Sequence, residues 1–446
     1  MSKCTQSIAP FPRVKKRAVD VRFGATTVSS DAGALLLGQI DRRLGLSESA
    51  AKALGDKRRQ RSCDHSVRDL LRQRVYAIGL GYEDLNDHAH LKSDLILQTA
   101  AGTEAALASP ATLCRFENRA TRDDCVALSK VLIETFVKSF RKAPKDLILD
   151  FDSTDDRVHG EQTGAIFNAH YGDYCFLPLY VFCGKKLLTA YLRPGTDVGP
   201  RHAWAILALL VRRFRQEWPG VKILFRADSA FNSSQILQWC DRESVDYVVA
   251  MRGWTPLKEM VETQRALFFV ENSYEANEKT VTRYDSFHYR AHRHGARHLW
   301  PENGRRIVLK AKHDGMSPTV RFVVTSLTGE SAKIFEEFYD PRGEMENRLK
   351  EQKLSLFSDR TSCQGWWANQ LRVLLSAMAY VLLEGLRSLA LKGTELATAQ
   401  CGTIRLKLLK IGAVVERNSR RVRILVSKSY PMPGLLERVA RELCPS

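Results

Sequence analysis

The stretch that decides the fold is Tyr339-Asp340-Pro341-Arg342-Gly343-Glu344-Met345-Glu346-Asn347-Arg348-Leu349-Lys350-Glu351-Gln352-Lys353. Asp340 followed by Pro341 predicts an N-cap and a first helical position, because a proline there loses only an N–H group that has no partner within the helix. We expect this helix to continue through Leu356. It carries charged residues whose spacing matters more than their number.

At about 100° per residue, Arg342, Glu346 and Lys353 fall within about 40° of one another on the helix surface. An apolar stripe of Met345, Leu349 and Leu356 adjoins them and is suited to packing on a core. A carboxylate at that border can bind a metal ion while the two cations meet phosphates. An ordinary solvated helix face with an Arg–Glu pair one turn apart would carry the same residues.

The spacing Tyr-x2-Arg-x3-Glu-x6-Lys resembles the YREK signature of the DDE transposases of bacterial insertion sequences. This resemblance implies a ribonuclease H-like catalytic core in which two upstream aspartates and Glu346 share the metal ions. It also implies that Tyr339, Arg342 and Lys353 position phosphates near the scissile bond.

The composition favours a polyanionic partner. The 446 residues include 68 basic and 50 acidic side chains, a net charge of +18, although a ribosome or a membrane surface would attract the same charge. Ten cysteines without a CxxC pair argue against a zinc ribbon and fit a reducing compartment. No apolar leader opens the chain, and the run from Val373 to Leu383 is too short to span a bilayer. We therefore expect a cytoplasmic protein with no membrane partner.

Residues 1–140 read as a helical region with basic surfaces, with helix-start signals such as Ser109-Pro110. Within it, Arg115, Asn118 and Arg119 lie one turn apart and could reach bases or phosphates in a major groove. A solvated helix face is the alternative. In the resembled family an N-terminal helical region recognises the terminal repeats of the element, which implies DNA binding for this region without selecting these side chains.

The segment from Asp146 to Thr154 predicts an apolar strand that ends in acids. Asp150 and Asp152 share one face, because strand side chains alternate. Two carboxylates on one face at a strand end are hard to explain by packing, although Asp152 could simply cap the next turn. The family's first acid stands in an Asp-x-Thr setting, which matches Asp152 through Thr154 and leaves Asp150 as the fallback metal ligand.

The pattern continues with two strands, a helix, a strand that ends at Asp228, a second helix and a fifth strand to Met251. Three strands, a helix, a strand, a helix and a strand is the order of a ribonuclease H-like fold. In that fold the first and fourth strands are neighbours, so Asp152 and Asp228 are expected to meet. The predicted fold class is α/β: a ribonuclease H-like core interrupted by a β-rich insertion, with an N-terminal helical DNA-binding domain.

From Gly253 the pattern changes to alternating runs in which basic and aromatic residues interleave. The YREK branch of the resembled family carries a β-rich insertion at this position, which contacts the DNA end and can hold a flipped base against an aromatic ring. Trp300 is the candidate for that stacking role. Packing of Trp300 beneath its own hairpin is the alternative.

The predicted organisation has five parts. They are residues 1–140, a helical DNA-binding region; 141–252, the first part of the core; 253–330, the β-rich insertion; 331–395, the glutamate helix and the helix after it; and 396–446, a basic β-rich segment with strands expected from Thr403 to Val415 and from Arg420 to Val426.

Taken together, these features predict a cut-and-paste DDE transposase. Asp152, Asp228 and Glu346 would hold two Mg²⁺ ions, with Mn²⁺ able to substitute, because oxygen ligands select these metals. The expected partners are double-stranded DNA, as terminal inverted repeats and as target, and a second copy of the chain on the paired ends. The alternatives are a ribonuclease H-like nuclease or resolvase without strand transfer, and a DNA-binding regulator whose catalytic site has decayed.

Overall fold

A computed structural model describes residues 11–14, 17–19, 27–56, 58–196, 199–252, 281–290, 297–313 and 319–444. The backbone of the predicted insertion between residues 253 and 280, and short parts of its remainder, lie outside the described residues. None of the described helices is long and apolar enough to cross a membrane.

An eight-stranded mixed sheet forms the centre of the chain, with the strand order β12-β13-β14-β11-β10-β4-β8-β9. The pairs β4–β10 and β10–β11 are parallel, and the other neighbours are antiparallel. The strands are β4 (Asp146–Ser153), β8 (Leu179–Cys183), β9 (Lys186–Tyr191), β10 (Lys222–Ala227), β11 (Asp246–Met251), β12 (Val281–Tyr289), β13 (Arg305–His313) and β14 (Thr319–Thr325).

Alternation along the strands builds a separate core on each face of the sheet. In β8, Val181 packs in one cluster with α8 (Ala203–Glu217) and α9 (Ser234–Arg242), whereas its neighbour Phe182 belongs to a second cluster with the long helix α13 (Trp366–Leu389). The helices α8 and α9 connect β9 to β10 and β10 to β11. A parallel pair needs such a crossover, because a hairpin cannot join its strands.

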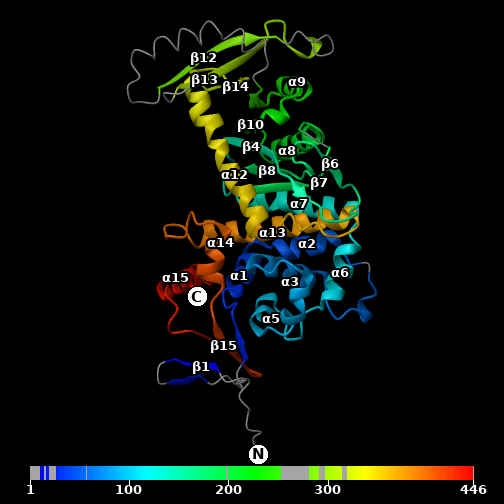
Figure 1. Ribbon diagram of the computed structural model, residues 1–446, viewed down its shortest axis with the longest axis vertical. Coiled ribbons are helices and arrows are strands. Elements are labelled where there is room, and N and C mark those ends of the chain that lie inside the picture. Colours follow the sequence, from blue (N-terminus) through cyan, green and yellow to red (C-terminus); the bar gives the residue numbers. More distant parts are fainter. Residues whose placement is uncertain are drawn as a thin grey trace, which may run out of the picture.

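The N-terminal helices share the second core with α13, below the sheet in the view of Figure 1. Their bounds are α1 (Ala34–Leu44), α2 (Leu46–Leu54), α3 (Val67–Leu80), α4 (His88–Leu91), α5 (Leu95–Ala101), α6 (Pro110–Asn118) and α7 (Arg122–Lys138). The C-terminal elements lie beside them: α14 (Cys401–Ile404), α15 (Pro433–Leu443), and the strands β15 (Ala413–Arg417) and β16 (Val422–Val426). These strands form a sheet in the order β16-β15-β3, in which β15 pairs with β3 (Thr27–Ser29). Two further strands, β1 (Phe11–Val14) and β2 (Arg17–Val19), form a hairpin of their own.

The predicted order of three strands, a helix, a strand, a helix and a strand is found as β4, β8, β9, α8, β10, α9 and β11. The described strands beyond residue 280 extend the same sheet, because β14 pairs with β11. The predicted domain boundaries remain predictions, but β14 shares hydrogen bonds with β11, and β12, β13 and β14 share a core with the strands before them.

The predicted start of the glutamate helix is wrong. Helical backbone begins at Ser331 rather than at Pro341, and passes through a π-helical turn, Ile334–Tyr339, a 3₁₀ turn, Asp340–Arg342, the helix α12 (Gly343–Lys350) and a second π-helical turn, Glu351–Ser355. Ile334 and Phe335 are buried against the sheet and stabilise the turns before the proline. Asp340 forms an ion pair with Lys310 on β13 at 2.6 Å instead of capping a helix.

The strand predicted from Thr403 is also wrong in its first half, because residues 401–409 are helical. The alternation of apolar and basic residues there suggested a strand. Cys401, Ile404 and Leu408 are buried at helical spacing, however, while Leu406 is 74% exposed. The chain also ends in a helix, α15, rather than in β structure.

Helix α3 begins with a complete capping box: the side chain of Ser66 accepts from the backbone N–H of Asp69, and Asp69 accepts from the backbone N–H of Ser66. Replacing Ser66 by alanine is expected to lower the free energy of unfolding by about 1 kcal/mol, since an orphan helix donor loses its acceptor. Ser233 is the matched control, because it precedes α9 without forming a side-chain cap. Thermal melting of both alanine variants measures their loss of stability. Equal losses for Ser66→Ala and Ser233→Ala would contradict the stabilising role of the capping box.

Candidate active site

Two acids stand at the carboxyl ends of neighbouring parallel strands, at the same edge of the sheet. Phe151 of β4 lies opposite Ala227 of β10, so the next residues, Asp152 and Asp228, lie side by side. Asp152 is the penultimate residue of β4, and Asp228 directly follows β10 and caps the short turn Ser229–Phe231 by accepting from the N–H of Ala230 at 2.9 Å. The strand register therefore brings the two predicted aspartates together.

Asp152 is only 7% exposed, and its carboxylate accepts two hydrogen bonds. Arg342 Nη2 donates to its Oδ2 at 2.7 Å, and the N–H of Ser153 donates to its Oδ1 at 2.9 Å. Burial raises the pKa of Asp152 to about 7; the charge of Arg342 opposes this, and the charges of Asp228 and Glu346 add to it. A buried carboxyl beside two others favours the arrival of a cation.

Glu346 projects from α12 towards Asp152. Both line a cavity of about 350 Å³ together with Lys353 and the segment from Ser153 to Thr154. Glu346 is exposed, whereas its neighbour Met345 is buried, as the predicted stripe requires. Among the residues that the structure describes, no group of three His, Cys, Asp or Glu side chains converges closely enough to hold a metal ion.

The predicted phosphate-binding residues surround these acids. Arg342 reaches Asp152, and its Nε is buried with no hydrogen-bond partner among the described residues. Burial raises the pKa of Tyr339; the charge of Arg342 opposes this and that of Asp228 adds to it. Lys353 Nζ donates to the backbone oxygen of Asp155 at 2.8 Å and to its Oδ1 at 2.9 Å.

Asp150 is engaged elsewhere. Arg226 of β10 binds it through both carboxylate oxygens, with Nη2 donating to Oδ2 at 2.7 Å, and the same guanidinium donates to the carbonyl of Phe338 at 2.6 Å. This buried ion pair joins β4, β10 and the helical segment that leads to α12. Asp152 is therefore the better candidate for the first acid.

The stacking role of Trp300 remains a prediction, and the ring is packed in this structure. Trp300 is 6% exposed, its Nε1 donates to Ser234 Oγ at 2.9 Å, and the Arg305 guanidinium lies 4.9 Å from the ring centroid. The ring also meets Tyr289 edge to face at 5.9 Å. These contacts favour the alternative of packing, because they leave no face of the ring open to a base.

The triplet of Arg115, Asn118 and Arg119 lies at the exposed end of α6. Asn118 donates to the carbonyl of Cys114, and the Arg119 guanidinium lies 5.3 Å from the centre of the Phe116 ring. These contacts leave the DNA contact and the solvated face equally open. The triplet belongs to a different element from the acids, and its role remains a prediction.

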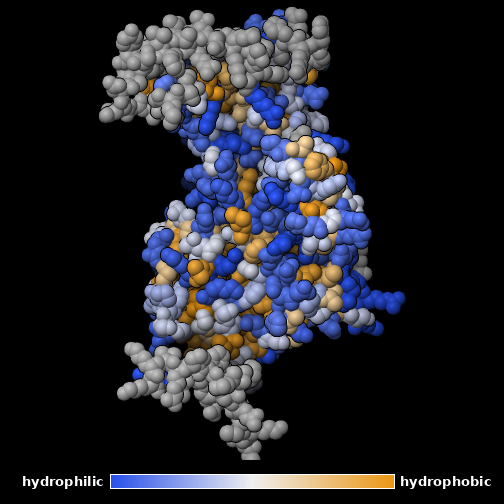
Figure 2. Space-filling model, viewed as in Figure 1, coloured by the Kyte–Doolittle hydropathy of each residue, from blue (hydrophilic) through white to orange (hydrophobic). Residues whose placement is uncertain are grey.

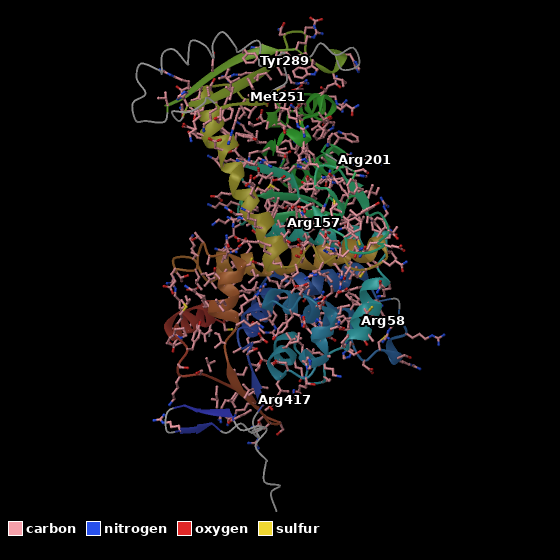
Figure 3. All side chains as sticks on the ribbon, viewed as in Figure 1. Arg58, Arg157, Arg201, Met251, Tyr289 and Arg417 are labelled. Carbon is pink, nitrogen blue, oxygen red and sulfur yellow. The ribbon has the colours of Figure 1, made fainter. Side chains whose placement is uncertain are left out.

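A small sheet that follows Asp152 adds an aromatic surface that the sequence patterns did not indicate. Its strands are β5 (Asp156–Arg157), β6 (Ile166–Asn168) and β7 (Asp173–Phe176), in the order β5-β7-β6. It exposes Phe167, Tyr171 and Tyr174. Burial raises the pKa of Tyr171, and the charges of Asp155, Asp152 and Asp228 add to this. Figure 3 shows Arg157 of this sheet midway along the molecule.

Asp156, just beyond the site, is expected to make stability depend on pH. Burial raises its pKa from the ordinary 3.8 to about 8, although Thr361 donates to its Oδ2 at 2.9 Å. Between these values the folded chain keeps a proton that the unfolded chain releases, so stability falls as pH rises. Asp156→Asn removes this effect. Relative to the parent protein, the free energy of unfolding of the variant should therefore increase by up to about 1.4 kcal/mol per pH unit from pH 4 to 8.

Melting temperatures of Asp156→Asn and the parent protein at several pH values measure that difference. The control is Asp173→Asn on β7, an acid that is less buried than Asp156. An advantage of Asp156→Asn that is constant across the range would contradict the raised pKa.

Comparison with known proteins adds the family. A solved cryo-EM structure of a piggyBac transposase synaptic complex with hairpin DNA resembles the chain at a TM-score of 0.40 and 12% identity, covering 85% of this chain and 79% of that one. No curated protein matches the sequence. Residues 11–446, nearly the whole chain, match the family described as transposase DDE domain group 1. The chain belongs to this family of DDE transposases.

Proposed function

We propose that the protein is a cut-and-paste transposase that cleaves the ends of its own element and joins them to target DNA. The observation that carries this proposal is the meeting of Asp152 and Asp228 at adjacent strand ends, with Glu346 and Arg342 acting on the same carboxylate. Family membership supports a transposase. The strand order β9-β8-β4-β10-β11, with α8 and α9 as crossovers, supports a ribonuclease H-like core.

The acids fit divalent metal ions in their chemistry. Asp152, Asp228 and Glu346 offer hard oxygen donors suited to Mg²⁺ or Mn²⁺. Burial raises the pKa of Asp152 even beside Arg342, and a bound cation would favour the charged carboxylate. Bound ions would supply activation of a water or hydroxyl nucleophile and charge neutralisation at the transferring phosphate. Glu346 stands on the exposed side of α12, so we expect it to approach the two aspartates on binding.

The other side chains would bind and orient the DNA. Arg342 carries an unpartnered buried Nε that can donate to a phosphate oxygen while its Nη2 holds Asp152. Lys353 is held beside the acids by Asp155 and offers a point charge to a second phosphate. The exposed rings of Phe167, Tyr171 and Tyr174 provide apolar faces for sugars or bases near the cut.

The wider partners follow from the reaction. Terminal inverted repeats and target DNA would be the substrates, and the charge of +18 favours both. Joining two ends to one target requires two catalytic sites, so we expect a homodimer on paired ends. A surface suited to DNA runs beside α12, where the outline of the molecule narrows and its residues are mainly hydrophilic (Figure 2).

A strand-transfer assay tests the proposal. The full chain is incubated with labelled duplexes that carry the ends of its element, a supercoiled target plasmid and Mg²⁺. The expected result is cleavage at the ends followed by covalent joining of the label to the plasmid.

Two outcomes would overturn the proposal. Ends that are cut but never joined would assign the protein to nucleases or resolvases without strand transfer. Specific binding to the ends without any cleavage, in Mg²⁺ and in Mn²⁺, would indicate a DNA-binding regulator with a decayed site.

A further inference from the structure

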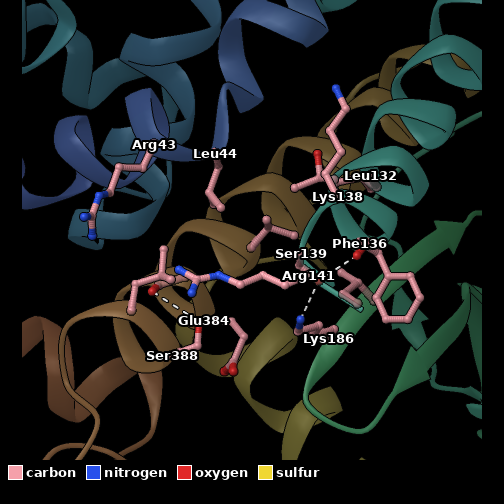
Figure 4. A pocket seen from close by; sticks show the side chains of 15 residues that line it. Arg43, Leu44, Leu132, Phe136, Lys138, Ser139, Arg141, Lys186, Glu384 and Ser388 are labelled. Atoms are coloured by element: carbon pink, nitrogen blue, oxygen red, sulfur yellow. Dashed lines mark hydrogen bonds between the residues drawn. The ribbon is translucent and has the colours of Figure 1, made fainter. Parts of the chain in front are cut away.

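A cavity of about 560 Å³ lies where α1, α7, β9 and α13 meet (Figure 4). Its apolar floor consists of Leu44, Leu132, Leu187 and Val381. Its polar lining is dominated by the cations Arg43, Lys138, Arg141 and Lys186. The cavity takes no part in the candidate active site.

The position of the cavity separates it from the acids. Ser139 and Arg141, in its wall, directly precede β4, whereas Asp152 stands near the other end of that strand. At about 3.3 Å per residue, Asp146 and Asp152 are about 20 Å apart, which is close to the width of a DNA duplex. A duplex on the catalytic acids would not fill this cavity at the same time without bending.

None of the four cations forms an ion pair among the described residues, although the charge of Glu134 interacts with Lys138 and that of Glu384 with Lys186. The one acid in the lining, Glu384, is already paired with Arg387 at 3.1 Å. Lys186 donates to Ser139 Oγ and lies 4.7 Å from the centre of the Phe140 ring, and burial lowers its pKa. Lys186 therefore carries its charge at a position where burial disfavours the charged form.

Helix dipoles explain only part of this arrangement. Arg43 and Lys138 stand in the last turns of α1 and α7, where a cation gains about 0.3–1 kcal/mol. Arg141 and Lys186 lie outside these helices and have no such compensation. Four like charges around one cavity repel one another, and an anion between them would remove that repulsion.

The form of the cavity indicates a polymer rather than a small anion. Arg43, Lys138 and Arg141 are exposed, so they stand on the rim. Both α1 and α7 end at this cavity, and the free backbone groups at a helix C-terminus are carbonyls rather than N–H groups, which disfavours a small anion bound at the helix ends. Further exposed cations, Arg42, Lys142 and Lys145, continue the charge beyond the rim.

We propose that this cavity is a second site for duplex DNA, in which backbone phosphates bind the rim cations and deoxyribose packs on the apolar floor. The inference rests on the proposed function only in taking DNA as the polyanion. The site would hold a duplex segment other than the one at the scissile phosphate.

The test is a triple variant, Arg43→Gln, Lys138→Gln and Arg141→Gln, in the full chain. Each change is at an exposed side chain, and a melting curve checks the fold. Duplex affinity is measured by fluorescence anisotropy from about 50 to 200 mM salt, where each phosphate contact contributes about 0.9 to the slope of log K against log salt. We expect the slope to shrink by about 3, while cleavage of a short duplex that reaches only the acids is unchanged.

The matched control is the triple variant Lys333→Gln, Arg423→Gln and Arg441→Gln, which removes the same charge at exposed ion pairs elsewhere. Its slope should change by less than about 1. Equal slopes for the two triple variants would overturn the inference. Because the slope reports DNA binding, this test remains valid even if the protein cleaves no DNA. Calorimetry with inorganic phosphate is a second test. If the parent protein binds phosphate, the rim variant does not, and the DNA slope is unchanged, the cavity is a small-anion site and the inference is overturned.

Discussion

Asp228→Asn is expected to reduce the rate of end cleavage by about 10³-fold or more while DNA binding is retained. Asp228 lies beside Asp152 and its charge acts on Asp152, Arg342 and Tyr339. Loss of one carboxylate weakens the hold on metal ions that contribute several kcal/mol of charge stabilisation in the transition state, and about 4 kcal/mol corresponds to 10³-fold. Asparagine keeps the size of the side chain and can still accept from Ala230.

Single-turnover cleavage, with end binding measured in parallel, tests this expectation. Glu346→Gln should give a similar loss, and Glu344→Gln is its matched control, because Glu344 lies on the same helix with only an exposed contact to Arg348 at 3.5 Å. If the Asp228→Asn protein still mobilised the element, the catalytic mechanism would be eliminated and a regulator with a decayed site would be supported.

Arg342→Gln is expected to reduce cleavage by about 10²-fold, the usual cost of losing one preorganised donor to a transition state. The variant should also need more Mg²⁺ at neutral pH. The charge of Arg342 lowers the pKa of Asp152, which is already about 7, so its removal moves that pKa higher and leaves less carboxylate to bind metal. Because raising the pH restores the carboxylate, the metal requirement should fall again in alkaline solution.

Cleavage rates across Mg²⁺ concentration and pH separate these two effects. Lys353→Gln is the comparison, because Lys353 contacts Asp155 rather than Asp152 and should lose rate without a shift in the metal requirement. A pH-independent metal requirement in Arg342→Gln would show that Arg342 does not act through Asp152.

Local patterns were sufficient to predict the centre of the fold. Apolar runs that end in an acid are short-range signals, and they located Asp152 and Asp228 at strand ends. The expectation that the two acids meet came from the resemblance to a ribonuclease H-like fold, in which the first and fourth strands are neighbours. The extension of the sheet by β12, β13 and β14 depends on the pairing of β11 with β14, which is a long-range contact that no local pattern reports.

Other features depended on tertiary packing. Pro341 signals a helix start, but Ile334 and Phe335 are buried on the sheet and extend the helical backbone before it. The alternation around Leu406 resembles a strand until the buried partners of Ile404 and Leu408 are known. Trp300 was a stacking candidate because it is an aromatic residue in a segment where basic and aromatic side chains interleave. Only the structure shows that Arg305 and Tyr289 cover its ring.

In the site, the residue types were predictable and their partners were not. The crowding of acids after Asp150 left the first ligand open, and the structure separates them: Asp150 binds Arg226, and Asp155 binds Lys353. The exposed rings of β6 and β7 were missed because a Tyr or Phe in a short loop-like segment has no signature of its own. The effect of the Asp152 charge on Tyr171 arises from tertiary proximity, which the spacing of the two residues in the chain does not indicate.

The most direct measurement is an anomalous-diffraction map of the protein crystallised with an end duplex and Mn²⁺. The account predicts two manganese peaks bound by carboxylate oxygens of Asp152, Asp228 and Glu346, with the scissile phosphate between them. Peaks that leave any one of these three acids uncoordinated, or that lie at other residues, would contradict it.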